Sequence, residues 1–224
     1  MENKNGRGIF LGVVSVATLV VAIIGATFAF FSAGVTSNAG DIGGNTLDIS
    51  DVGLSLDVHK VNLGGSATYG DDLVPAVFTN ENAAEFNAAL TKHCVDDGGD
   101  YTGCHLYEIV ATSASAVSSA DILLSMTTTA SVNTNWKYAV YTGTSASVGT
   151  VKNVATIAST STPYNMNANL GLPAGGTTYY LLVYLKNIDA SQNPGDATDE
   201  TGTYSGTVTL NAAGGQVKAT FTAS

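Results

Sequence analysis

The stretch Thr178–Ile188, TYYLLVYLKNI, decides the fold that the sequence predicts. Its side chains are apolar at successive positions rather than at every second one, from Tyr179 to Leu185. A short continuous apolar run of this kind predicts a strand that is buried on both of its faces. We therefore expect this stretch at the centre of a sheet.

The segments before and after this central stretch alternate between apolar and polar side chains. This period of two is typical of half-buried strands. The segments that share the pattern are Leu47–Val58, Ile122–Thr128, Trp136–Val140, Tyr204–Leu210 and Val217–Phe221. A phase slip near Asp51 predicts a bulge or a short bend, and the Gly214-Gly215 pair predicts a hairpin. The sequence thus predicts a mainly β protein: an antiparallel β-sandwich of jelly-roll or Greek-key type over residues 47–224.

One short helix is expected in this domain, within Asn80–Lys92. Asn82 and Glu85 have the spacing of a capping box, and Phe86 and Leu90 are one helical turn apart. This spacing predicts a surface helix that covers one end of the sandwich.

The N-terminal region has the layout of a secretory signal peptide. A short segment with two basic residues is followed by the apolar run Ile9–Phe31, and no charge occurs between residues 8 and 40. Small residues at the end of this hydrophobic helix predict cleavage by signal peptidase after Ala29, with cleavage after Phe30 as a weaker variant. Residues 1–29 are then the signal peptide, and the domain is expected to be extracellular or at the cell surface.

Two alternatives remain open for this segment. The apolar run has about 23 residues, enough to span a bilayer as a retained helix, so that residues 9–31 form a membrane anchor. The other alternative is a prepilin leader that is cut near Gly8, although the early glutamate that is typical of prepilins is missing.

Charge excludes one class of partner. The chain has 224 residues with 8 Lys and Arg against 18 Asp and Glu, a formal net charge of −10. Nucleic-acid binding needs clustered basic side chains to contact the phosphates, so we expect no nucleic-acid partner.

Cys94 and Cys104 are the only cysteines. In an exported chain, two cysteines so close in sequence predict a disulfide. His93 and His105 flank the pair and raise the alternative of a metal site, but the spacing matches no common zinc pattern. The acidic residues inside the loop, Asp96, Asp97 and Asp100, are weak candidates for calcium, and no other cofactor is expected.

Catalytic motifs are missing from the sequence. It contains no HExxH helix, no GxSxG elbow and no P-loop. The three histidines, His59, His93 and His105, are scattered and do not suggest a triad. We expect that the protein is not an enzyme.

A family resemblance rests on the first 55 residues. Gly25–Ser32, GATFAFFS, precedes a polar arm and then Asn45–Ser50, NTLDIS. These segments resemble the start of the TasA/camelysin family of secreted bacterial matrix fibre proteins, which carry a SipW-type signal peptide. Some members of that family are classed as metalloproteases, and this chain lacks the zinc-helix motif for that activity.

The resemblance implies a subunit of an extracellular surface or biofilm-matrix fibre that assembles with copies of itself by donor-strand exchange. The donor would be the extended arm, residues 30–46. Its first part, Phe30–Asn38, has no charge and no proline, so it suits strand addition to a neighbour's sheet. Phe31, Ala33 and Val35 would face one way and Phe30 the other, with Phe31 and Val35 as the anchors. The alternative function is a membrane-anchored or pilin-like surface or adhesion domain that keeps its N-terminal helix.

Overall fold

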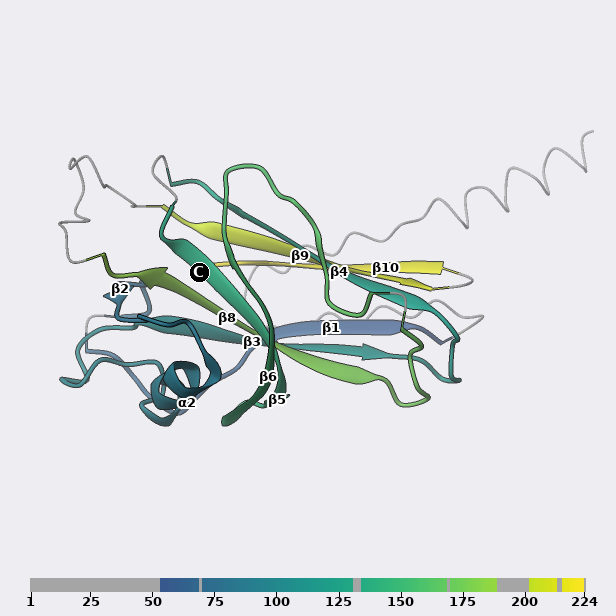
Figure 1. Ribbon diagram of the computed structural model, residues 1–224, viewed down its shortest axis with the longest axis horizontal. Helices are drawn as coiled ribbons and strands as arrows, with labels where there is room; N and C mark the ends of the chain where they lie inside the picture. The colour runs from purple at the N-terminus through teal and green to yellow at the C-terminus, as the bar shows by residue number, and fades with distance from the viewer. Residues whose placement is uncertain are drawn as a thin grey trace, which may run out of the picture. The chain divides into compact units, whose positions relative to one another are not determined.

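The computed structural model describes residues 53–68, 70–130, 134–168, 170–188, 202–212 and 215–223. These residues form ten β-strands and one helix (Figure 1). The elements are β1 (Ser55–Lys60), β2 (Pro75–Ala76), α2 (Ala83–Thr91), β3 (Cys104–Thr112), β4 (Ala120–Thr128), β5 (Trp136–Thr144), β6 (Ser147–Thr156), β7 (Tyr164–Asn165), β8 (Thr177–Lys186), β9 (Tyr204–Ala212) and β10 (Gly215–Thr222). The leader 1–29 and the arm 30–46 lie outside the described residues.

The strands form two sheets. Sheet 1 has the order β1-β3-β8-β5-β6, and sheet 2 has the order β10-β9-β4-β7. Between these strands all pairings are antiparallel except one: the two-residue β2 runs parallel to the end of β8. The chain crosses repeatedly from one sheet to the other, as in Greek-key connections, and the expectation of an antiparallel β-sandwich with one short helix is confirmed.

Strand β8 lies between β3 and β5 and is buried on both faces, as its sequence predicts. Tyr179, Leu181 and Val183 belong to the core between the two sheets. Tyr180 and Tyr184 face the other way, into a second core on the outer side of sheet 1. Since successive side chains of a strand point to opposite faces, a strand inside two cores must be apolar throughout.

Helix α2 covers that second core with Phe86 and Leu90, on the side of sheet 1 away from β4, β9 and β10 (Figure 1). Asn82 is its N-cap, and the Asn82 side chain accepts hydrogen bonds from the N–H groups of Ala84 and Glu85. The capping box is only half formed, because the Glu85 carboxylate accepts from the N–H groups of Asn80 and Glu81 rather than from that of Asn82.

Four strands are additions to those that the sequence predicts: the two-residue β2 and β7, and the long strands β3 and β6. The hairpin at Gly214-Gly215 is confirmed, since β9 and β10 pair from Ala212 and Gly215 onward. In contrast, β3 and β6 do not show the clean alternation on which the sequence analysis relies. The phase slip near Asp51 lies outside the described residues.

Candidate functional site

The expected disulfide between Cys94 and Cys104 is confirmed, with the two Cα atoms 5.0 Å apart. Cys94 comes just after α2, and Cys104 is the first residue of β3. Both are buried in the second core, on the outer side of sheet 1, with Phe86 and Leu90. The bond therefore fastens the end of the helix to sheet 1.

Two acidic side chains of the disulfide loop, Asp96 and Asp97, have partners within the protein. One Asp96 carboxylate oxygen accepts from the N–H groups of Asp100 and Tyr101, at 2.7 and 2.9 Å. The bond from Tyr101 lowers the pKa of the Asp96 carboxyl. Asp97 pairs with Lys92 at 2.5 Å. Within the described ranges no group of three or more His, Cys, Asp or Glu residues has the arrangement of a metal site, so the structure gives the calcium candidates no support.

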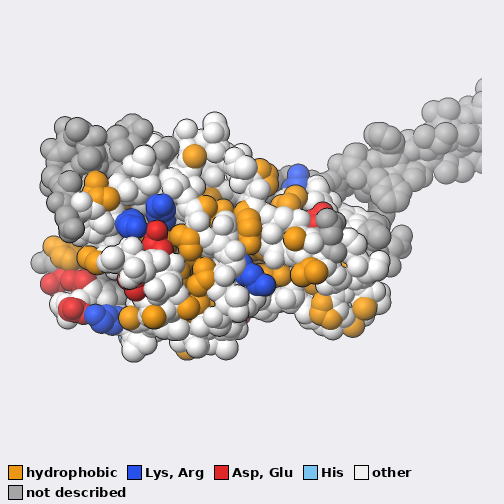
Figure 2. Space-filling view, viewed as in Figure 1, with side chains coloured by type: hydrophobic (Ala, Val, Ile, Leu, Met, Phe, Trp, Pro, Cys, Tyr) orange, Lys and Arg blue, Asp and Glu red, His pale blue; other side chains and the backbone are white. Residues whose placement is uncertain are grey.

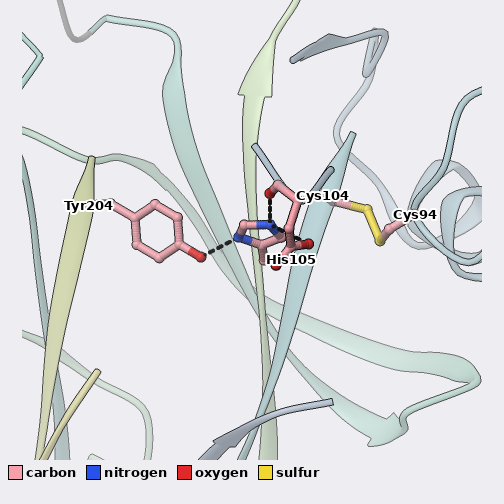
Figure 3. The surroundings of a disulfide bond; sticks show 5 residues. Cys94, Cys104, His105 and Tyr204 are labelled. Carbon is pink, nitrogen blue, oxygen red and sulfur yellow. Dashed lines mark hydrogen bonds and ion pairs between the residues drawn. A yellow bond between two sulfur atoms is a disulfide. The ribbon is translucent and has the colours of Figure 1, made fainter. Parts of the chain in front are cut away.

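The three histidines lie in three separate environments. His93 is exposed after α2, and His59 on β1 contacts Asp57 and Glu108 at 2.8 and 3.2 Å. His105 is 3% exposed and points into the space between the sheets. Figure 3 shows the imidazole directed toward Tyr204, whereas Cys104 extends to the disulfide on the other side of β3. His105 and the cysteine pair consequently do not converge on one site.

A buried hydrogen-bond network surrounds His105. Its Nδ1 lies 2.6 Å from the Tyr204 hydroxyl, which lies 2.7 Å from the Tyr107 hydroxyl. Its Nε2 lies 2.7 Å from the backbone carbonyl of Asp71. Because a carbonyl only accepts, Nε2 carries the proton, and in the neutral ring Nδ1 accepts from Tyr204. Tyr107 then donates to Tyr204, so that every group in the network has its partner.

Burial controls the protonation of this network. Desolvation lowers the pKa of His105, and the nearby charge of Lys60 lowers it further, while Asp71 acts in the opposite direction. Desolvation also raises the pKa of Tyr107 to about 12 and that of Tyr204 well above its ordinary value. The imidazole is therefore neutral and both phenols are protonated near pH 7.

This network connects elements rather than exposing a reactive group. Tyr204 belongs to β9 of sheet 2, and His105 and Tyr107 belong to β3 of sheet 1. Both ring nitrogens of His105 are engaged, so neither is available as a general base. This network cannot be predicted from local sequence patterns, because His105 and Tyr204 lie 99 residues apart.

Three of the cavities on the described surface differ in the charge of their linings. One of about 360 Å³ lies between β2 and α2, and its lining includes Glu85, Lys92, Asp96 and Asp97. A second, of about 380 Å³, has Lys60 and Asp71 among its lining residues. The third, of about 280 Å³, is lined by Met126, Tyr138, Asn153, Ala155, Thr156, Ala158, Thr160, Thr162, Pro163 and Tyr164, none of which is charged. On the face shown in Figure 2, acidic side chains gather at the end that holds β2 and α2.

The predicted site residues fall into two groups. Cys94 and Cys104 are brought together, while Asp96, Asp97 and Asp100 remain in the loop between them. The cleavage residues Ala29 and Phe30 and the donor residues Phe31, Ala33 and Val35 lie outside the described residues. In the part of the chain that is described, no helix is long and apolar enough to span a bilayer.

Comparison with known proteins gives no family. No family model matches the chain, and no curated protein matches it. Among solved structures, the chain is similar to the PA14 domain of the MpAFP antifreeze protein, with 13% identity over 84% of this chain and 96% of that chain, and a TM-score of 0.20. At that TM-score the similarity carries no argument about fold or function.

Proposed function

We propose that this chain is an exported structural subunit of an extracellular surface or biofilm-matrix fibre, and that it assembles by donor-strand exchange of its mature N-terminus. The observation that carries the proposal is the combination of a disulfide-fastened β-sandwich with a preceding stretch, residues 30–40, that has neither charge nor proline. A strand added to a sheet edge is held by main-chain hydrogen bonds, and apolar side chains at alternate positions supply specificity.

The described domain supports a structural role over a catalytic one. Its buried histidine and the Asp96 carboxylate of its acidic loop are engaged in internal hydrogen bonds that hold strands and turns. The disulfide is typical of oxidising compartments, which supports a location outside the cytoplasm. In this proposal the partners are signal peptidase during export, the membrane through residues 9–31 before cleavage, and then copies of the same chain.

Truncation tests the proposal. Chains that begin at Phe30 and at Gly40 are purified and compared for filaments by electron microscopy. We expect filaments from the longer chain only. A third chain that begins at Phe30 and carries Val35→Asp keeps the length of the arm but puts a charge at an anchor position, and it should also remain monomeric. Normal polymerisation of the chain that begins at Gly40 contradicts assembly through the arm.

The second candidate function is a surface or adhesion domain that retains its helix, either as a membrane anchor or as a pilin-like core. The length of the apolar run, about 23 residues, favours it. Mass spectrometry of the protein from its native cells distinguishes the two. An N-terminus at Phe30 or Phe31 supports the cleaved subunit, an intact run supports the anchor, and an N-terminus at Ile9 supports the pilin-like form.

A further inference from the structure

The two lateral sides of the sandwich differ. On one side β1, the last strand of sheet 1, lies against β10, the last strand of sheet 2. On the other side sheet 1 ends in the ten-residue β6, whereas sheet 2 ends in β7, which has only two residues. Sheet 2 therefore has no full-length strand opposite β6.

The edge of β4 is open where such a strand would pair. β7 pairs with β4 only at Leu123 and Leu124. If that register continued, Met126 would face Thr162, but the chain moves away and returns only where the Thr128 N–H bonds to the Ala158 carbonyl, at 3.2 Å. Among the described residues, none bonds to the Met126 main chain on this side.

The uncharged cavity of about 280 Å³ lies at this gap, and its lining includes Met126 and Tyr138 as well as Thr162 and Tyr164 of the segment that leaves β4. Met126 and Tyr138 are 4% and 5% exposed, so the cavity reaches the core between the sheets. A cavity of about 150 Å³ is known to accept a benzene ring, so this volume suffices for a phenylalanine side chain.

We infer that this gap is the acceptor site for the arm of a second copy of the chain, with Phe31 or Val35 in the cavity and the arm main chain bonded to Met126. The inference rests on the proposed function and adds the place where the donor strand binds. Chemical complementarity favours this cavity, since residues 30–40 carry no charge and neither do its lining residues, whereas the cavities of about 360 and 380 Å³ include charged side chains in their linings. In the chain that begins at Phe30, the 23 residues from 30 to 52 precede Gly53 and supply the length of the arm.

The start of the described domain and the gap lie on opposite lateral sides, and this placement favours a filament over a closed dimer. The chain enters the described domain at Gly53, next to β1, whereas the gap is lined by residues of β4, β5 and β6 on the other lateral side. In sheet 1, β1 and β6 are four strand spacings apart, a distance of roughly 19 Å at the usual strand spacing. An arm that leaves one side and binds the opposite side of its neighbour makes a head-to-tail contact, which continues as a filament where the rotation between subunits does not close a ring.

Cross-linking between different chains tests the inference. A subunit with Val35→Cys is mixed with one that carries Thr162→Cys in the lining of the gap, or with one that carries Lys218→Cys on the edge strand β10 as the matched control. Both chains begin at Phe30 and keep the native disulfide. After assembly and mild oxidation, we expect a disulfide-linked dimer with Thr162→Cys and none with Lys218→Cys. Cross-linking to Lys218→Cys alone, or to neither partner while filaments form, overturns the inference.

Filling the cavity gives a second test. Ala155→Leu adds volume to the lining, and Ala116→Leu places the same change at an exposed position outside it. We expect the Ala155→Leu protein to fold, as judged by circular dichroism, and to form at least tenfold fewer filaments, while Ala116→Leu polymerises like the unmodified chain. Equal polymerisation of both variants contradicts the acceptor site alone. Absence of filaments from the unmodified chain contradicts the proposed function itself.

Discussion

The buried imidazole of His105 has one hydrogen-bonding arrangement that satisfies all of its neighbours. The Asp71 carbonyl requires a proton on Nε2, and this leaves Nδ1 as the acceptor for Tyr204. A second proton on the ring would turn Nδ1 into a donor, and Tyr204 would lose its acceptor. It would also place a positive charge in a site that is 3% exposed and near Lys60.

This arrangement predicts that acid destabilises the protein through His105. The pKa of His105 is lowered in the folded state from its ordinary 6.5, so below that pH the unfolded chain binds a proton that the folded chain does not. The free energy of unfolding should be highest above about pH 6.5 and should fall as the pH is lowered through 6 toward the folded-state pKa. Urea denaturation between pH 8 and pH 5 measures the slope.

The matched control is a change at another histidine. His105→Gln removes the titrating group and should flatten the slope between pH 6.5 and 5. His93→Asn changes an exposed histidine whose φ is 57°, a conformation that asparagine tolerates, and should keep the slope. Equal slopes in the two variants would assign the pH dependence to other groups.

At the scale of the elements, the disulfide joins helix α2 to strand β3 across a sequence separation of 10. A cross-link of this loop length restricts the unfolded chain and stabilises the fold by about 2.5–3 kcal/mol on the loop-entropy estimate. We expect dithiothreitol to lower the free energy of unfolding by that amount, measured by urea denaturation. The Cys94→Ala/Cys104→Ala protein should show the lower stability in both conditions, and a response of this variant to dithiothreitol would rule out the assignment.

The N-cap of α2 gives a second prediction at this scale. Asn82→Ala leaves the N–H groups of Ala84 and Glu85 without their acceptor and should cost about 1 kcal/mol of stability. Asn82→Asp retains a side-chain oxygen and should cost much less. Thermal or urea denaturation of the two variants checks this order, and equal losses would mean that the cap contributes nothing.

The elements also show what sequence reasoning can recover. β8 is recognisable in the sequence because both of its faces are buried and its residues are apolar from Tyr179 to Leu185. β4, β9 and β10 are recognisable because one face lies in the core and the other is more exposed, so apolar and polar residues mostly alternate. β3 carries a histidine on its inner face, so its period is obscured. β6 is an edge strand with irregular pairing to β5 and with many partly exposed positions, and such strands lose the hydrophobic signal.

The candidate site also divides into features that are local in the sequence and features that depend on the fold. The disulfide could be predicted, because the cysteine count and spacing are local in the sequence. The contact of His105 with Tyr204 could not, because it depends on how β3 and β9 face each other across the sandwich. Similarly, the gap beside β4 arises because β7 pairs with β4 at only two positions before the chain moves away. No residue pattern in the sequence indicates where this pairing ends.

For the whole molecule, charge sets the conditions for assembly: the chain that begins at Phe30 keeps 17 Asp and Glu against 6 Lys and Arg, a formal net charge of −11. Subunits of like charge repel one another, and salt shortens the range of this repulsion from about 30 Å at 0.01 M to about 8 Å at 0.15 M. If the proposed fibre forms, its growth should be faster at the higher salt concentration. Light scattering of the chain that begins at Phe30 measures the rate, and slower growth at high salt would mean that attraction between charges drives assembly.

The central place of β8 also sets the order in which the protein can take shape during synthesis. β1 and β3 can pair as soon as residue 112 is made, and β5 and β6 by residue 156, but each pair meets the other only through β8. The middle of sheet 1 therefore cannot form until residue 186 has been added. With its decisive contacts so distant in sequence, this fold belongs to the slow class, which matures in milliseconds to seconds rather than microseconds.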